Sequence, residues 1–104
     1  MSKLMQSRIV LKGGEIDFAR TALEEASARL KAAGAPDMAR PYDDLIGQID
    51  TTRKYGDGKS AAVTAIGGGI DCFKAALGAA ADKAEGARLA ELVRKQTRGL
   101  GKFA

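Results

Sequence analysis

The stretch that decides the fold is Ser60-Ala-Ala-Val-Thr-Ala-Ile-Gly-Gly-Gly-Ile-Asp-Cys-Phe-Lys-Ala-Ala-Leu-Gly-Ala-Ala-Ala-Asp82. Its apolar residues recur at spacings of three and four, a period typical of a helix that turns one face to the core. We therefore predict a helix over 59–81. Its core-facing positions include Val63, Ile66, Ile70, Phe73 and Leu77.

Three consecutive glycines, Gly67, Gly68 and Gly69, interrupt the middle of this apolar stripe. A glycine inside a helix costs about 0.8 to 1 kcal/mol relative to alanine, so some other interaction has to offset the run. Alanines lie on both sides, and a surface of small residues lets another helix approach closely. We expect the glycines to mark a close helix contact, within the protein or between copies. The alternatives are a loop or kink, or an anion-binding loop.

Two further helices are predicted upstream. Residues 15–33 carry an apolar residue at every third or fourth position, with acidic side chains in the first turn and basic ones in the last, as the helix dipole favours. Gly34 followed by Pro36 ends that helix. A proline suits the first position of a helix, so Pro41 is expected to begin a second helix over 41–54. The connection is short, which predicts antiparallel packing of the pair.

The apolar phase changes after the 59–81 helix, which indicates a new element. Asp82 with Glu85 three residues later resembles a capping box, the pattern that satisfies the first backbone N–H groups of a helix. We predict a fourth helix over 83–97. The alternative is one long helix bent near Gly86.

The two ends of the chain are expected to be flexible, as an arm over 1–12 and a tail over 99–104. The arm contains the short apolar run Arg8-Ile-Val-Leu-Lys12, for which a strand, an arm laid on a neighbour and a turn or two of helix remain open. The predicted fold class is all-α: a single domain over 1–104, built as a small bundle of three to four helices with an N-terminal arm.

Composition argues against several classes of function. The chain has no histidine and one cysteine, Cys72. Histidine is the commonest general base and metal ligand, and a lone cysteine excludes an internal disulfide and a cysteine-rich metal site. The adjacent carboxylate pairs, Glu24-Glu25 and Asp43-Asp44, point in different directions on a helix. We expect no catalytic residue, no cofactor and no metal. A small enzyme subunit is kept as the second alternative.

The core is expected to be thin. Aromatic residues make up 5% of the 104 residues and tryptophan is absent, so helices rich in small side chains gain little stabilisation per contact. Pairing with another copy or another protein would complete such a core. We therefore predict a non-enzymatic protein-interaction module, a small helical regulator, adaptor or inhibitor that forms a homodimer. The predicted interface comprises Val63, Ile66, Gly67, Gly68, Gly69, Ile70, Phe73 and Leu77.

The charge balance leaves a second partner class open. A net charge of +4 permits contact with nucleic acid or an acidic protein, although the two signs are mixed along most of the chain. The alternative function is therefore a nucleic-acid-associated protein that uses a basic C-terminal helix. The competing interpretation is a solvated helix end that complements its own dipole. The basic residues concerned are Arg88, Arg94, Lys95, Arg98 and Lys102.

Residues 60–81 are the stretch to consider for a membrane span. They carry Asp71 and Lys74 near the middle, each of which costs about 2.5 to 3.5 kcal/mol on an insertion scale. We expect no contact with a membrane. The first residues lack the apolar core of a secretory signal, so a cytoplasmic protein is expected.

Overall fold

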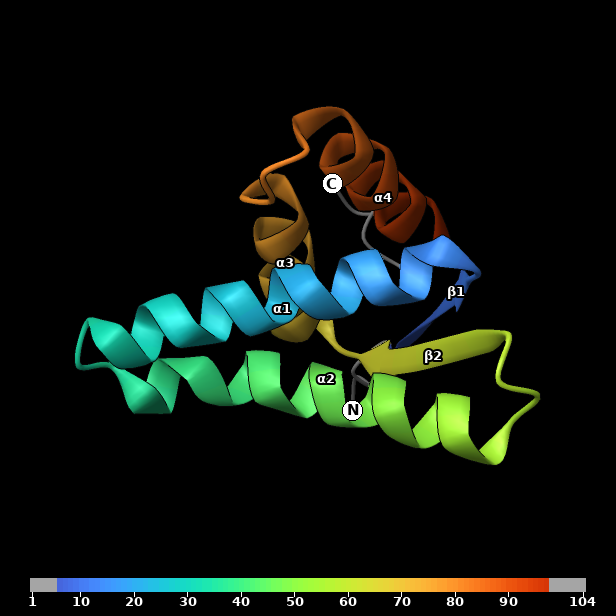
Figure 1. The fold of residues 1–104 in the computed structure, drawn as a ribbon, viewed down its shortest axis with the longest axis horizontal. Helices are drawn as coiled ribbons and strands as arrows, with labels where there is room; N and C mark the ends of the chain where they lie inside the picture. The colour runs from blue at the N-terminus through green and yellow to red at the C-terminus, as the bar shows by residue number, and fades with distance from the viewer. Residues whose placement is uncertain (1–5, 98–104) are drawn as a thin grey trace, which may run out of the picture.

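The computed structural model describes residues 6–97 (Figure 1). Over this range the chain forms four helices and one two-stranded sheet, which confirms the predicted class of small helical bundle. The elements follow one another as β1 (Ser7–Lys12), α1 (Gly14–Ala32), α2 (Pro36–Tyr55), β2 (Ser60–Ala65), α3 (Gly67–Gly78) and α4 (Lys83–Gln96).

Helices α1 and α2 form the predicted antiparallel pair and lie side by side over most of their length (Figure 1). Helix α2 begins at Pro36, not at Pro41 as expected, so Pro41 lies inside the helix. A proline suits the first position of a helix, so either Pro36 or Pro41 could have begun α2 from the sequence alone. Because proline has no N–H, the carbonyl of Asp37, four residues before Pro41, receives no helical hydrogen bond from it. Asp37 lies in the first turn of the helix and is exposed to water.

Polar contacts fix the register of this helix pair. Arg20 donates to both carboxylate oxygens of Asp50, at 2.8 and 3.0 Å, and this hydrogen bonding holds the pKa of Asp50 below its ordinary value. The buried hydroxyl of Ser27 donates to Asp43 at 2.6 Å. That bond, with a smaller contribution from Lys31, lowers the pKa of Asp43.

The predicted helix over 59–81 is wrong in its first third, because residues 60–65 form strand β2 and α3 begins at Gly67. Strand β2 pairs antiparallel with β1, in a register that places Ile9 opposite Val63 and Leu11 opposite Ala61. An alanine-rich run of six residues is compatible with either period, so the local pattern does not separate strand from helix. Residues 60–65 form a strand because they pair with β1, which lies about fifty residues earlier in the sequence.

The structure also corrects the predicted flexible N-terminal arm, within the described residues 6–12. Residues 7–12 are a strand, one of the three conformations left open, and the side chains of Ile9 and Leu11 are fully buried. The expected flexibility of the first residues and of the tail over 99–104 concerns residues outside the described range.

One hydrophobic core joins all six elements. The inward face of the sheet and the buried faces of the four helices contribute to it, and its largest members are aliphatic apart from Phe73. The fully buried large side chains are Ile9, Leu11, Ile16, Leu23, Leu45, Ile49, Val63, Ile70, Phe73, Leu77, Leu89 and Val93.

Helices α3 and α4 are separate, as the predicted capping indicated. The Asp82 side chain accepts a hydrogen bond from the backbone N–H of Glu85 at 3.1 Å and so caps α4. No helix within residues 6–97 is both long and apolar enough to cross a membrane.

The close helix contact expected at Gly67–Gly69 lies at Gly86 instead. A Cβ atom at Gly86 would overlap the carbonyl oxygen of Leu77 and stand 3.3 Å from its carbonyl carbon, so α4 approaches the end of α3 only because residue 86 has no side chain. A Cβ at Gly67 or Gly68 meets nothing within 4 Å. The glycine run opens α3, and the close approach it makes within residues 6–97 is that of Gly69 to Ala65 of the preceding strand.

Replacing Gly86 with alanine should lower the free energy of unfolding by about 1 to 3 kcal/mol, because the added methyl group has backbone atoms in its way. Gly47→Ala is the matched control, since Gly47 also lies inside a helix but has open space at its Cβ position. The control should stabilise the protein by about 0.5 to 1 kcal/mol. Urea denaturation of both variants measures the difference, and a neutral or stabilising G86A would contradict the close contact.

Candidate interaction surface

The structure divides the predicted interface into a buried part and an exposed part. Val63, Ile70, Phe73 and Leu77 are at most 1% exposed and lie in the chain's own core, so they are not available to a partner. A helical period identifies a face that avoids water, but it does not say whether the chain itself or a second molecule covers that face. Ile66 is 40% exposed.

The exposed part lies where β2 gives way to α3. Ile66 has an extended backbone at this junction, and its carbonyl accepts a hydrogen bond from the N–H of Ile70 at 3.0 Å. A Cβ at Gly69 would stand 2.9 Å from that of Ala65, so a glycine is needed for the chain to turn tightly from strand into helix. Gly68 is exposed and Gly67 and Gly69 are half-buried.

A groove of about 320 Å³ lies beside Ile66, between the first half of α2 and the start of α3. Its apolar lining includes Pro41, Leu45, Ala65 and Ile66, and Asp44 supplies a carboxylate. We call Pro41, Ala65, Ile66, Gly67 and Gly68 the Ile66 surface. It combines one large exposed aliphatic side chain with small residues that let a second molecule approach the backbone.

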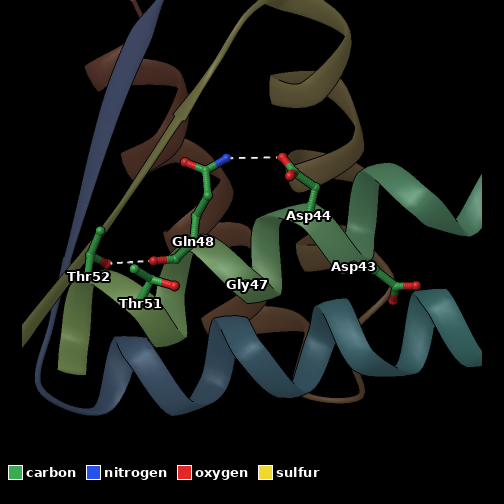
Figure 2. A pocket seen from close by; sticks show the side chains of 6 residues that line it. All are labelled: Asp43, Asp44, Gly47, Gln48, Thr51 and Thr52. Carbon is green, nitrogen blue, oxygen red and sulfur yellow. Dashed lines mark hydrogen bonds between the residues drawn. The ribbon is translucent and has the colours of Figure 1, made fainter. Parts of the chain in front are cut away.

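The outer edge of β2 is occupied by side chains of α2. Gln48 pairs with Thr64 like a neighbouring strand, because its Oε1 accepts from the Thr64 N–H at 2.7 Å and its Nε2 donates to the Thr64 carbonyl at 3.1 Å. One helical turn later, the Thr52 hydroxyl accepts from the N–H of Ala62 at 2.8 Å and lies 3.1 Å from the Ala62 carbonyl. Figure 2 shows Gln48 and Thr52 on the side of α2 that faces the strand.

The outer edge of β1 is capped in the same way by α4. The Gln96 amide accepts from the N–H of Val10 at 3.0 Å and donates to its carbonyl at 3.2 Å, while Glu15 accepts from the N–H of Lys12 at 3.0 Å. Side chains that take the place of a neighbouring strand prevent a partner from extending the sheet. The sheet edges are therefore excluded at these positions as a docking site.

A hollow on α2, drawn in Figure 2, is lined by polar residues that the fold already uses. Asp43 is held by Ser27 and Lys31, and Asp44 accepts from the Gln48 amide at 3.2 Å. These side chains already form the bonds that set the α1–α2 register and cover the edge of β2. We assign no ligand to the hollow.

Tyr42 and Cys72 are neighbours in the structure, and both residues are half-buried. Burial raises the pKa of Tyr42, and the neighbouring Cys72 side chain raises it further. Across residues 6–97 no three His, Cys, Asp or Glu side chains gather into a group able to hold a metal ion.

The predicted basic contact residues are largely engaged by the chain's own carboxylates. Arg88 bonds Glu85 at 2.7 Å and also reaches Glu15 at 3.4 Å, which raises the pKa of Arg88. Arg94 is paired with the Glu91 side chain three residues earlier. Lys95 is exposed. Arg98 and Lys102 lie outside the described residues.

Comparison with protein-family models, with curated proteins and with solved structures finds no match for this chain. The Ile66 surface retains Ile66, Gly67 and Gly68 from the predicted interface and adds Pro41 and Ala65.

The capping of β2 gives a direct test with neighbouring threonines. Thr52→Val keeps the shape of the side chain but leaves the N–H of Ala62, a buried residue, without its partner, so the free energy of unfolding should fall by about 1 to 3 kcal/mol. Thr51→Val is the control, because Thr51 is exposed on the same helix. It should change stability by less than about 0.5 kcal/mol. Equal stabilities of the two variants in urea denaturation would show that the Thr52 bonds contribute nothing.

Proposed function

We propose that the chain is a non-enzymatic protein-interaction module, a small helical regulator, adaptor or inhibitor that pairs with a second copy of itself through the Ile66 surface. The observation that carries the proposal is the position of Ile66. A large aliphatic side chain is 40% exposed beside a groove lined by Pro41, Leu45 and Ala65. The proposal assigns the chain no catalytic residue, cofactor or metal.

The stability of the proposed dimer depends on its two-fold symmetry. Fully burying an isoleucine side chain is worth about 1.5 to 3 kcal/mol, so covering the exposed part of Ile66 contributes about 1 kcal/mol per copy. A two-fold axis brings the same surface of both copies together, which doubles that contribution. Pro41, Ala65 and the exposed glycine backbone add further apolar area. We expect a moderately stable dimer whose population depends on concentration.

The charges beside the surface favour a second copy over a partner of one sign. Asp44 lines the groove, and Arg40 lies one helical turn before it on the same face of α2. Arg40 is 80% exposed at its side chain, and its ion pair with Asp37 at 3.1 Å contributes little because both side chains are in water. A surface with both signs at its margin is self-complementary, because each copy offers a cation to the carboxylate of the other.

The cytoplasm is the proposed location. Cys72 is a free thiol, and free thiols are typical of reducing compartments.

Ile66→Lys tests the proposal, because it places a charge at the centre of the expected interface. The dimer dissociation constant should rise more than tenfold, since two copies of a lost contact worth about 1 kcal/mol each exceed the 1.4 kcal/mol that a factor of ten requires. Sedimentation equilibrium over a wide concentration range measures it.

The matched control is Tyr55→Lys. Tyr55 is 79% exposed and lies ten residues from Leu45 along α2, a separation of about 15 Å. This variant should dimerise like the wild type. A wild-type chain that stays monomeric throughout the range, or an equal loss in both variants, would contradict a dimer formed through Ile66.

A further inference from the structure

The cations of this chain are not spread evenly between paired and unpaired positions. Within residues 6–97, most lysine and arginine side chains contact a carboxylate, a carbonyl or an aromatic ring of the chain itself. Five make none of these contacts: Arg8, Lys12, Arg29, Lys59 and Lys95. Arg8 and Lys12 lie on strand β1, while Lys59 and Lys95 are on segments that bond to it or to its end.

We call these four, Arg8, Lys12, Lys59 and Lys95, the basic hairpin surface. Arg8 and Lys12 alternate with the buried residues of β1 and are exposed on its outward face. Lys59 is exposed beside the end of β1, where its carbonyl accepts from the N–H of Gly13 at 3.3 Å. Lys95 precedes Gln96 on α4, and the Gln96 amide bonds Val10, midway between Arg8 and Lys12.

Three carboxylates lie close to this surface: Glu15, Asp57 and Glu91, the last of which interacts electrostatically with Lys95. Glu15 accepts from the N–H of Lys12 but is paired with Arg88. Asp57 accepts from the N–H groups of Lys59 and Ser60 at 2.8 and 3.2 Å and offsets part of the positive charge. The four cations outnumber the three carboxylates, so the surface keeps an excess of positive charge.

We propose that the basic hairpin surface binds the phosphate backbone of a nucleic-acid duplex without reading its sequence. This goes beyond the proposed self-association and does not depend on it. Arg8 and Lys12 are four residues apart on a strand, about 13 Å at 3.3 Å per residue, a spacing close to the major-groove width of about 12 Å. A sheet face lying across the groove therefore directs one cation toward each phosphate backbone.

The side chains between the cations favour duplex phosphates over other partners. Besides the two cations, the outward positions hold half-buried Val10, buried Ala62, and the hydroxyl residues Ser60 and Thr64, so the face has no aromatic ring on which the bases of a single strand would stack. It also lacks the large buried anchor that carries most protein interfaces. Exposed cations with a nearby hydroxyl, here that of Thr64, are sufficient for phosphate contacts.

Fluorescence anisotropy of a labelled mixed-sequence DNA duplex, titrated with the full chain at several salt concentrations, tests the proposal. Four phosphate contacts predict a slope of log K against log salt of about −3.6. The double variant R8Q/K12Q should lower the steepness of the slope by about 1.8. Circular dichroism of the same samples checks that the fold is retained.

The control R29Q/K31Q removes the same charge from the last turn of α1. It should leave the slope unchanged. Three results would overturn the proposal: no binding at low salt, an equal loss in the control, or tighter binding to single-stranded DNA or polyglutamate than to the duplex. None of them bears on the sedimentation test of Ile66, so the two proposals fail separately.

Discussion

A two-stranded sheet inside a helical protein has two open edges, and the fold depends on how their backbone groups are satisfied. Two strands alone are marginal in water. Here Gln48 and Thr52 of α2 bond the outer edge of β2, and Gln96 of α4 bonds that of β1. These bonds let a short hairpin bring Ile9, Val63 and their neighbours into the core without leaving peptide groups unpaired.

The edge contacts also determine where the helices lie. Because α2 is bonded to β2 and α4 to β1, the chain leaving β2 has to turn at once into α3, which leaves Ile66 exposed at the junction. Helix α4 then has to return across the end of α3, where only Gly86 allows the approach. Helix α4 packs against the inward side of the sheet and bonds the edge of β1, and the cations on the outward face of β1 stay exposed. Both proposed surfaces thus follow from the same arrangement.

The sequence predicts the elements whose signals are local and misses those that depend on distant partners. The caps and charge patterns of 15–33 and 83–97 locate α1 and α4 closely. Residues 60–65 are misread, because their pairing with 7–12 and their bonds to α2 have no local signal. The predicted interface fails for Val63, Ile70, Phe73 and Leu77 for a related reason: a buried face looks the same in sequence whichever molecule covers it. The pairing of Arg88 and Arg94 with carboxylates three residues earlier was visible in the spacing.

Amide hydrogen exchange at the sheet edges tests most directly the claim that side chains replace the missing strands. The N–H groups of Val10, Ala62 and Thr64 should exchange much more slowly than that of Gly58, which lies in the exposed turn before β2. Gln48→Ala should accelerate exchange at Thr64 while leaving Val10 protected. Exchange at all three edge amides as fast as at Gly58 in the wild-type protein would contradict the account.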